Sequence, residues 1–499
     1  MALPDREGTK SPAPIRRAPE RASTPLPGTF GLTIDPATRA LDQGRVLLGG
    51  DPRRLLRFAP RAVAMVRRWE AGAPVGDRRA DQMLARRLVA SGAFLPRPAP
   101  PALGPADVTV VIPVRDRPDQ LRRLLSALEG MACVVVDDGS RDAARTRAVA
   151  RCAGARLVAL ATNCGPSAAR NAGLTQVGTP IVAFIDSDCI PGDGWLEPLL
   201  AHFADPMVAA VAPRIVPAPV TAPTSLSRYQ AGHSSLDLGA SAGLVCPMSR
   251  IPYVPSAALL VRRSTVDDDL FDPALRGGED VDVVWRLVES GWDVRYEPSS
   301  RVHHDGPRSV VSWLGRRAFY GTTAGPLARR HPGSLAPLRS SAWTLGVWAL
   351  VVARKPVIAA GALAISIGAL SRKLDGLVEH PLTVAARIAG RGTVASALPA
   401  WHGLARAWSP AWALALCWRR TRSAAALAML LPASGDWVAH RAGLDPVRYA
   451  ALRVADDLAY GSGVWLGCLQ ARTLAPLVPH IAWTAPAGRS NHDGVPLVR

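Results

Sequence analysis

The sequence predicts an α/β domain with a mostly parallel sheet, preceded by a small module and followed by an apolar helical region. Apolar strand-like runs alternate with helix-like stretches from about residue 107 to 330, a Pro-rich run precedes them, and long apolar runs follow residue 331. Alternating strands and helices are typical of parallel sheets whose strands are joined by helical crossovers. We therefore expect one catalytic-type domain between two regions of different composition.

The composition indicates an anionic partner and a reducing compartment. The 499 residues include 59 Lys and Arg against 40 Asp and Glu, a net charge of +19. Nucleotide phosphates or an acidic membrane surface fit this charge. The sequence contains no helix-turn-helix, zinc-finger or RNA-binding signature, so we expect no nucleic-acid partner. The seven cysteines form no C-x-x-C pair, which is typical of cytosolic proteins.

The chain begins with two regions that differ from the α/β part. Residues 1–30 are rich in Pro, Arg and Ser and lack a hydrophobic segment, which predicts a disordered basic tail and no signal peptide. Residues 31–98 combine short strands, a Gly-Gly-Asp-Pro turn and two helical patterns. They favour a winged-helix-like module, or else an N-terminal extension of the next domain. A linker at 99–106 follows.

Carboxylate pairs follow two buried strands of the 107–330 domain. The strand at 133–136 ends at Asp137-Asp138, and the strand at 181–185 ends at Asp186-Ser187-Asp188. The carboxyl ends of parallel strands meet at the ligand-binding edge of an open sheet. Carboxylates there suit Mg²⁺ or Mn²⁺ bridged to substrate phosphates, although a polar turn after a strand gives the same pattern. No G-x-G-x-x-G or P-loop motif occurs, which argues against dinucleotide enzymes and P-loop NTPases.

Two further polar motifs lie in the second half of this domain. Glu279-Asp280 precede a helix that continues through Leu287, where they serve either as catalytic carboxylates or as helix-capping groups. His303-His304 follow a strand at 294–296 and are either metal ligands or part of a polar turn.

The region 331–499 carries apolar runs bordered by arginine and tryptophan. The runs at 342–353 and 357–370 are separated by Arg354-Lys355-Pro356. Each is shorter than the roughly 17–25 residues of a spanning helix, although together they fit one kinked span or a re-entrant hairpin. Basic and aromatic borders suit an acidic membrane interface, and an ordinary helical core is the alternative. We expect the protein at the cytoplasmic side of the cell membrane, and otherwise in the cytoplasm.

These motifs together resemble the inverting family 2 glycosyltransferases, which have the Rossmann-like GT-A fold. The resemblance covers residues 107 to 310 and rests on Val110–Val114, Asp137–Ser140, Arg170–Gly173, Asp186–Asp188, Trp195-Leu196 and Glu279-Asp280. The order of leading module, catalytic domain and apolar tail is similar to the mycofactocin-system glycosyltransferases of actinobacteria. In such systems the leading module is similar to winged-helix elements that bind a ribosomal precursor peptide.

The resemblance implies a role for each matching residue. A UDP-sugar donor would be held by Pro113, Asp137, Asp138, Arg170 and Asp186, with Asp137 or Asp138 on the uracil or ribose and Arg170 near the diphosphate. Mg²⁺ or Mn²⁺ would be held by Asp188 and by His304, which is preferred to His303. Asp186 would contribute through ribose or water. Asp280 would be the base and Glu279 would position it. Where processive synthases carry Gln-x-x-Arg-Trp, this chain offers only Arg316 or Arg317 as a diphosphate clamp.

The implied function is transfer of a hexose, glucose first among candidates, to a peptide-derived redox cofactor or its precursor. Inverting transfer needs one carboxylate to accept the proton of the acceptor hydroxyl and an electrophile on the departing diphosphate. A lipid or cell-wall acceptor is the alternative within the same class. A catalytically silent protein that binds a peptide and a membrane is the alternative from another class, against which the complete set Asp188, Glu279 and Asp280 argues.

Overall fold

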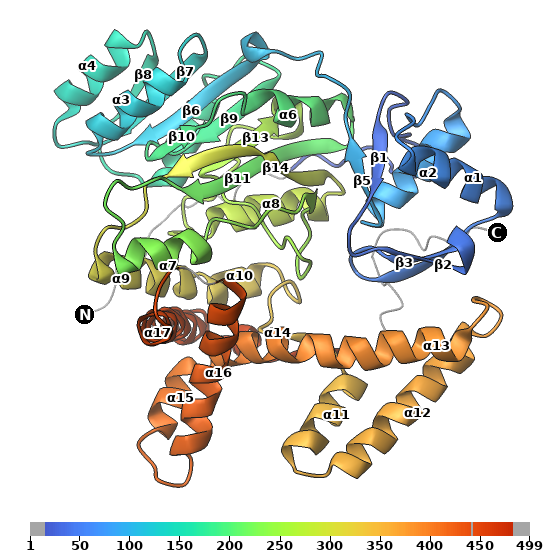
Figure 1. The fold of residues 1–499 in the computed structure, drawn as a ribbon. Helices are drawn as coiled ribbons and strands as arrows, with labels where there is room; N and C mark the ends of the chain where they lie inside the picture. Colours follow the sequence, from blue (N-terminus) through green and yellow to red (C-terminus); the bar gives the residue numbers. More distant parts are fainter. Residues whose placement is uncertain (1–14, 441–442, 483–499) are drawn as a thin grey trace. The chain divides into compact units, whose positions relative to one another are not determined.

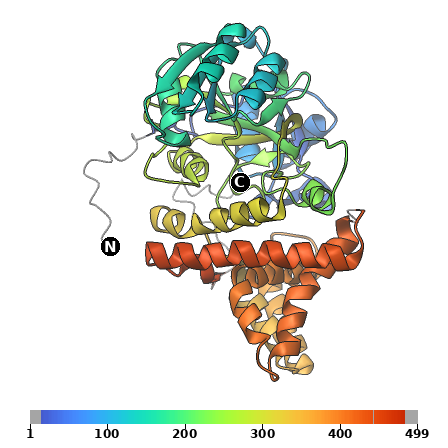
Figure 2. The same ribbon diagram turned by 90° about the vertical axis from the view of Figure 1, so that its left-hand side faces the viewer.

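The computed structural model describes residues 15–440 and 443–482, which divide into two compact units. The first unit comprises residues up to Thr33, Gly72–Ala90 and Leu95–Arg308. The second comprises Ile34–Ala71, Ser91–Phe94 and the chain from Ser309 onward. Figures 1 and 2 show an α/β sheet domain in the first unit and mainly helices in the second. The expected boundaries at residues 98 and 330 remain predictions.

Within the described residues, the first unit is built on a nine-stranded sheet, which confirms the α/β class. Its strand order is β10-β14-β11-β13-β9-β6-β7-β8, with β12 paired to β14. The strands are β6 (Val108–Val114), β7 (Ala132–Asp138), β8 (Arg156–Leu160), β9 (Ile181–Ile185), β10 (Cys189–Pro191), β11 (Val208–Pro217), β12 (Gly243–Leu244), β13 (Ala258–Arg262) and β14 (Asp293–His304).

One half of the sheet is parallel and contains the switch in strand order. Strand β6 pairs in parallel with β7 on one side and with β9 on the other. The connecting helices are α3 (Pro118–Ala127), α4 (Ala143–Cys152) and α5 (Pro166–Leu174). All five residues of β9 are buried, as expected for a parallel strand covered on both faces. Ligands bind open sheets at the carboxyl ends of strands beside such a switch.

The other half of the sheet is mixed. Strand β13 runs antiparallel to both β9 and β11, and β11 runs parallel to β14. The β11–β14 register shifts between Pro213 and Arg214, which lets β14 continue through Pro298 to His304. This strand therefore carries the two histidines back beside β10. Three helices complete this half: α6 (Leu196–Ala201), α7 (Ser225–His233) and α8 (Glu279–Glu289).

Residues 15–30 differ from the disordered tail expected over residues 1–30. Leu26 and Phe30 are fully buried, and Trp292 Nε1 donates to the carbonyl of Arg16 at 2.7 Å. Burial of these two apolar side chains favours an ordered segment, although the average composition of residues 1–30 predicts disorder. Residues 1–14 of the expected tail lie outside the described residues.

A buried charge network holds helix α2 (Arg79–Ala90) to the sheet of the first unit. Arg86 pairs with Asp205 at 2.6 Å, and Arg295 pairs with the other oxygen of the same carboxylate. Both arginines and Asp205 are almost completely inaccessible to solvent. The arginines hold the pKa of Asp205 at about 2, although burial alone would raise it. A buried charge without its partner would be costly, so the network fixes this packing.

The second unit joins part of the leading region to the C-terminal helices. Strands β2 (Arg39–Leu41), β3 (Val46–Gly49) and β4 (Arg54–Arg57) form an antiparallel sheet beside α1 (Pro60–Glu70). Val46 packs in one apolar cluster with Leu374 and Val384. A separate pair, β1 (Gly31–Ile34) and β5 (Phe94–Arg97), completes the leading region.

Helix α17 (Pro446–Ala471) is the central packing partner of the C-terminal helices. Its Gly463 and Gly467 lie against Gly321 of α9 (Val310–Thr322) and Gly325 of α10 (Ala324–Arg330) so closely that a Cβ at any of them would overlap backbone atoms. The remaining elements are α11 (Ala342–Val352), α12 (Pro356–Leu374), α13 (Pro381–Ala386), α14 (Gly392–Ala407), α15 (Ser409–Ala415), α16 (Arg422–His440), β15 (Arg339–Ser341) and β16 (His480–Ala482).

One helix within the described residues, α12, is long and apolar enough to cross a membrane. Its 19 residues contain a window with mean hydropathy 1.5 that is 11% buried. Length and composition alone support this assignment. The expected apolar runs at 342–353 and 357–370 thus become two separate helices joined by a tight turn at Arg354.

Candidate active site

The Asp186-Ser187-Asp188 segment forms a tight turn between β9 and β10. The amide of Asp186 donates to the carbonyl of Ala257 at 3.0 Å, and the amide of Cys189 donates back to the carbonyl of Asp186 at 2.9 Å. The buried strand β9 therefore delivers both carboxylates to the sheet edge in a fixed geometry. This is the edge at which the switch in strand order predicts a ligand.

Arg170 joins this strand end to the acidic start of α8. Its guanidinium donates to Asp186 Oδ1 at 2.6 Å and to Glu279 Oε1 at 3.0 Å. The arginine is buried and stacks over the ring of Phe271, 5.3 Å from the ring centre. Burial would lower the pKa of Arg170, but Asp186 and Glu279 outweigh it and raise the pKa. One fixed cation thus holds two carboxylates from separate elements.

Asp280 lies beside this bridge in the first turn of α8. Its Oδ1 accepts from the amide of Val281 at 2.8 Å and its Oδ2 more weakly from that of Ser256 at 3.4 Å. Burial, reinforced by the charge of Glu279, raises the pKa of Asp280 to about 7. A carboxylate with a pKa near neutrality is well matched to accept a proton from a hydroxyl.

Asp188 is surrounded by groups that suit an anionic ligand and a metal. It pairs with Arg117, which follows β6, and its Oδ1 lies 3.8 Å from His304 Nε2. The amide of Asp305 donates to the carbonyl of Asp188 at 2.9 Å, which keeps the end of β14 against this turn. A nearby pair, Arg123 and Asp305, adds a second exposed cation.

The donor set at Asp188 fits a divalent ion only in part. Among residues 15–440 and 443–482, no three His, Cys, Asp or Glu side chains converge closely enough to form a complete metal site. Mg²⁺ and Mn²⁺ commonly take one or two protein ligands and complete their shell with substrate phosphates and water. Asp188 and His304 therefore fit a metal that binds together with a diphosphate.

Asp137 and Asp138 organise the loops that follow β7 and β8. Asp137 Oδ1 accepts from the amide of Ser140 at 3.0 Å. Asp138 accepts from the amides of Cys164 and Gly165 at 2.7 and 2.9 Å. Both carboxylates are almost fully buried and already bonded, so a structural role in loop packing accompanies any contact with a nucleotide.

The remaining predicted residues are spread over both units. Pro113 lies half-buried in β6, opposite Val136 of β7. Arg316 and Arg317 lie on α9 in the second unit, where Arg317 is buried and paired with Asp456. His303 Nδ1 is buried and has no hydrogen-bond partner among the described residues.

Sequence reasoning missed three residues of the site. Arg117 immediately precedes α3 and Arg123 lies on α3, where the sequence pattern predicts only an amphipathic helix. Asn171 accepts from the amide of Phe271 at 2.9 Å and donates to its carbonyl at 2.7 Å, so it fixes the segment that leads to α8. Arginines in the loop and helix after the first strand of a sheet predicted to bind phosphate are the available signal.

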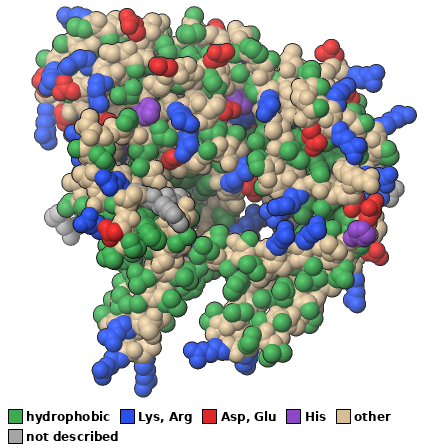
Figure 3. Space-filling model, viewed as in Figure 1, with side chains coloured by type: hydrophobic (Ala, Val, Ile, Leu, Met, Phe, Trp, Pro, Cys, Tyr) green, Lys and Arg blue, Asp and Glu red, His purple; other side chains and the backbone are tan. Residues whose placement is uncertain are grey.

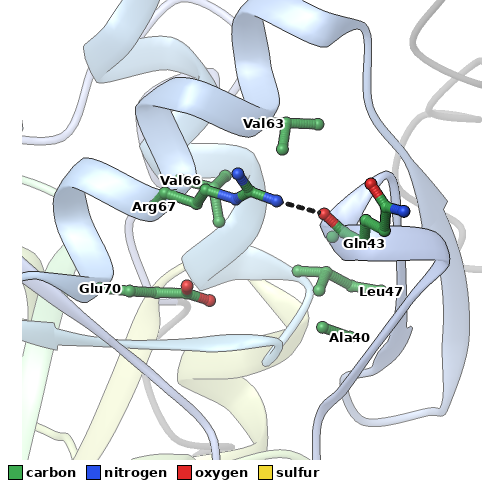
Figure 4. A pocket seen from close by; sticks show the side chains of 8 residues that line it. Ala40, Gln43, Leu47, Val63, Val66, Arg67 and Glu70 are labelled. Carbon is green, nitrogen blue, oxygen red and sulfur yellow. Dashed lines mark hydrogen bonds between the residues drawn. The ribbon is translucent and has the colours of Figure 1, made fainter.

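A separate hollow lies in the second unit between α1 and the β2–β3 hairpin (Figure 4). Its volume is about 280 Å³. Apolar side chains of Leu47, Val63 and Val66 line it, while Arg67 donates to the carbonyl of Gln43 at 2.7 Å across one side. Its size and apolar lining suit a side chain or small group of a bound partner.

The chain matches one family model and is similar to several characterised proteins. Residues 109–267 match the family described as Glycosyl transferase family 2. Over 474 residues the chain is 40% identical to the pre-mycofactocin glycosyltransferase of Mycobacterium tuberculosis, strains CDC 1551 / Oshkosh and ATCC 25618 / H37Rv. That alignment covers 92% of this chain and 99% of the relative.

More distant relatives match only part of the chain or share little identity. The glycosyltransferase AglE of Haloferax volcanii is 27% identical over 202 residues, covering 38% of this chain and 64% of that protein. Among solved structures, the mannosyltransferase PcManGT of Pyrobaculum calidifontis in complex with GDP-Man and Mn²⁺ is 16% identical, with a TM-score of 0.35. That match covers 72% of this chain and 90% of the other.

Proposed function

The chain belongs to family 2 of the glycosyltransferases and, within it, to the pre-mycofactocin glycosyltransferases, and we propose that it moves a hexose from a UDP-sugar to a peptide-derived acceptor with inversion. Its catalytic domain has the GT-A fold, with the mostly parallel sheet expected for this family. Glucose is the first candidate for the hexose. A redox cofactor made from a peptide, or its precursor, is the proposed acceptor, in line with the name of the 40% identical relative.

The observation that carries the proposal is the Arg170 bridge between the two acidic motifs. It holds Glu279, next to Asp280, in fixed relation to Asp186 at the strand end. In a single in-line displacement the acceptor hydroxyl and the departing diphosphate must be positioned at the same time, on opposite sides of the anomeric carbon. The bridge supports Asp280 as the base because it fixes the start of α8 and leaves the Asp280 carboxylate outside the ion pair.

Asp280 accepts the proton of the acceptor hydroxyl as that oxygen attacks the anomeric carbon. A pKa of about 7 leaves a large fraction of the carboxylate ionised at neutral pH, so that it can accept a proton in the transition state. Glu279 positions Asp280 through its bond to Arg170 and raises its basicity through its own negative charge. No carboxylate nucleophile is needed, in contrast to retaining glycosidases.

Residues around Asp188 receive the leaving diphosphate. Mg²⁺ or Mn²⁺ held by Asp188 and His304, with Asp186 through ribose or water, would supply a Lewis acid that neutralises the developing charge. Arg117 and Arg123 lie beside these ligands and are partly exposed, so their guanidiniums can turn toward phosphate oxygens. We also propose Pro113, Asp137, Asp138 and Arg170 as the nucleotide side of the site. Arg316 or Arg317 remains a proposed clamp from the second unit.

The leading region is the proposed holder of the acceptor. The hollow between α1 and the β2–β3 hairpin supports this role because it offers an apolar lining with polar groups at its rim. We propose the region 31–98 as a winged-helix-like recognition module on this ground. The seven cysteines are all unpaired, which supports a cytoplasmic location for the reaction.

The proposed reaction is tested by a mass-shift assay with the purified full-length chain. Mn²⁺, UDP-glucose and the maturing peptide product are incubated with wild type, with Asp280→Asn, and with Glu289→Gln as a matched control on the same helix. We expect one-hexose increments with wild type and control only, and a β-linked product by NMR coupling constants. An α-linked product would overturn inversion, and UDP release without a shift in this acceptor would overturn the acceptor class.

A pool of other UDP- and GDP-sugars in the same assay tests the donor. Transfer from a GDP-sugar in preference to all UDP-sugars would contradict the proposed donor while leaving the transferase activity in place. If no nucleotide sugar is consumed or bound, the alternative of a silent peptide-binding protein replaces the proposal.

A further inference from the structure

Two helical hairpins of the second unit extend from the same side of α13, α14 and α17. Hairpin A consists of α11 and α12, residues Ala342–Leu374, and hairpin B of α15 and α16, residues Ser409–His440. Figures 1 and 2 show both hairpins projecting together from these supporting helices. The turns at Ala353–Lys355 and Leu416–Thr421, together with the helix ends on either side of each turn, form the two tips.

The helices of hairpin A lack the burial that their composition requires. Helix α11, of sequence AWTLGVWALVV, is apolar on all sides, yet Val347 is its single buried residue. Helix α12 is 11% buried over its most apolar window. A helix that is apolar all round belongs in a protein core or in lipid. The described residues cover little of the surface of these two helices, and contact with lipid would supply the apolar surroundings that their composition favours.

The tips combine exposed apolar side chains with basic ones. Val352 and Val357 of hairpin A are 78% and 83% exposed, and Trp418 of hairpin B is 61% exposed. Neither 340–374 nor 401–435 contains an Asp or Glu residue. The tips carry exposed basic residues instead, namely Arg354, Lys355, Arg419, Arg420 and Arg422. Figure 3 shows the apolar surface of both hairpins ending in Lys and Arg side chains.

The contacts with α14 limit how far the tips project. Trp348 Nε1 of α11 donates to the carbonyl of Thr393 at 3.1 Å, and Trp401 Nε1 of α14 donates to the carbonyl of Ala428 at 3.2 Å. Each contact lies six residues from a tip arginine, Arg354 or Arg422. Six helical residues span about 9 Å. That depth reaches the boundary of headgroups and acyl chains and falls far short of the roughly 30 Å hydrocarbon core.

We propose that the tips of hairpins A and B insert together into one leaflet of an anionic lipid bilayer without crossing it. The apolar side chains enter the acyl boundary while the adjacent arginines and Lys355 stay at the phosphates, as long basic side chains do. A bilayer suits the tips better than an acidic protein groove, because the apolar surface surrounds the helices on all sides. Two tips carried by the same supporting helices bind more tightly than either alone. This inference does not depend on the sugar-transfer reaction.

An environment-sensitive fluorophore on Cys417 tests the insertion directly. Cys417 is exposed at the tip of hairpin B, and the other exposed cysteines, Cys152 and Cys164, are replaced by Ser. With phosphatidylglycerol-containing vesicles we expect a blue shift, and with phosphatidylcholine alone none. The same fluorophore on Cys152, in a Cys417→Ser chain, is the control and should not shift. Unchanged Cys417 emission on the anionic vesicles overturns the proposal.

Charge variants at an exposed tip test the lipid preference. Arg419→Gln with Arg420→Gln should weaken binding to anionic vesicles about 30-fold, since each basic residue near such a surface contributes about a fivefold factor. Arg147→Gln with Arg151→Gln, exposed on α4 of the first unit, removes the same charge and should leave vesicle binding within about twofold. Equal losses in both pairs would show attraction by net charge alone and overturn a tip-specific site.

Bromine-labelled lipids distinguish shallow insertion from crossing. Quenching of the Cys417 fluorophore should be strongest from bromines near the headgroups and weak from bromines at the bilayer centre. Strongest quenching at the centre, or protein that resists extraction by alkaline carbonate, would overturn the one-leaflet geometry. Unchanged circular dichroism and melting temperature of each variant exclude loss of folding as the cause.

Discussion

Arg170 is the residue on which the proposed chemistry of this site depends most. It is buried, and its guanidinium divides its bonds between Asp186 at the end of β9 and Glu279 at the start of α8. Its charge permits two carboxylates to sit in a buried site, and its planar geometry fixes their distance. Asp280 lies next to this pair without belonging to it, which leaves a carboxylate of raised pKa available for proton transfer.

The pH dependence of transfer should report the pKa of Asp280. We expect kcat/KM to fall tenfold per pH unit below about pH 7, because the base must be ionised and its pKa is raised to about 7. Glu279→Gln removes the negative charge that raises this pKa, so the acid limb should move to lower pH while the maximum rate drops. A pH–rate profile of both enzymes measures this. An acid limb that stays in place in Glu279→Gln would contradict the coupling of the two carboxylates.

The sequence predicted the acidic residues of the site better than the basic ones. Asp186, Asp188, Glu279 and Asp280 follow strand ends or begin a helix, positions that pattern and family resemblance both identify. Arg117 reaches Asp188 across 71 positions of sequence, and no local pattern encodes such a pairing. The assignment of roles to these residues remains a proposal that the kinetic experiments test.

Helices pack very closely where glycines of α17 meet those of α9 and α10. A Cβ on Gly321 would overlap the carbonyl of Tyr460 and the amide of Val464, while a Cβ on Gly315 of the same helix α9 would meet nothing within 4 Å. The absence of side chains lets the helix backbones approach directly. It also brings Arg317 of α9 to the buried Asp456 of α17.

Alanine at these two glycines should have opposite effects on stability. Gly315→Ala should stabilise the second unit by about 0.4–1 kcal/mol, because alanine restricts the unfolded chain and favours the helix. Gly321→Ala should destabilise it by about 1–3 kcal/mol, because the helices must separate. Chemical denaturation followed by circular dichroism measures both. Equal stabilisation by the two substitutions would refute the close approach of α9 and α17.

Elements with regular apolar patterns were predictable, and those that bury charge were not. The strand at 181–185 appears with the predicted bounds because its residues are apolar throughout. Helix α17 went unrecognised because Arg453, Asp456 and Asp457 interrupt its apolar pattern, although all three are buried as ion pairs. Strand β14 was predicted only over 294–296, since Pro298-Ser299-Ser300 resembles a turn but lies at the register shift with β11.

Across the first unit, a buried network connects the leading region to the catalytic sheet. Asp205→Asn should lower the free energy of unfolding by about 3–5 kcal/mol. It removes the buried negative charge with which both Arg86 and Arg295 pair. Asp119→Asn, which weakens exposed pairs with Arg122 and Arg145, should lower the free energy of unfolding by no more than about 1 kcal/mol. Thermal unfolding of the two variants compares them. Similar melting temperatures would contradict the structural role of the network.

The whole molecule should not need a metal ion to fold. Among the residues that the structure describes, no group of three metal-binding side chains converges, so the metal is expected to bind only together with the nucleotide diphosphate. EDTA should therefore leave the melting temperature of the free protein unchanged and abolish the stabilisation that UDP gives in the presence of Mn²⁺. Differential scanning fluorimetry measures both effects. A lower melting temperature of the nucleotide-free protein in EDTA would reveal a structural metal.

Donor binding and proton transfer are assigned to different residues, Asp188 and Asp280. The most direct test measures nucleotide binding by calorimetry and the turnover rate for both Asp280→Asn and Asp188→Ala. Asp280→Asn should bind UDP-sugar with Mn²⁺ as wild type does but lose about 10²- to 10⁴-fold in turnover. Asp188→Ala should lose the Mn²⁺-dependent part of nucleotide binding. Wild-type turnover in Asp280→Asn would remove Asp280 from the mechanism, and an unchanged metal requirement in Asp188→Ala would contradict the proposed metal position.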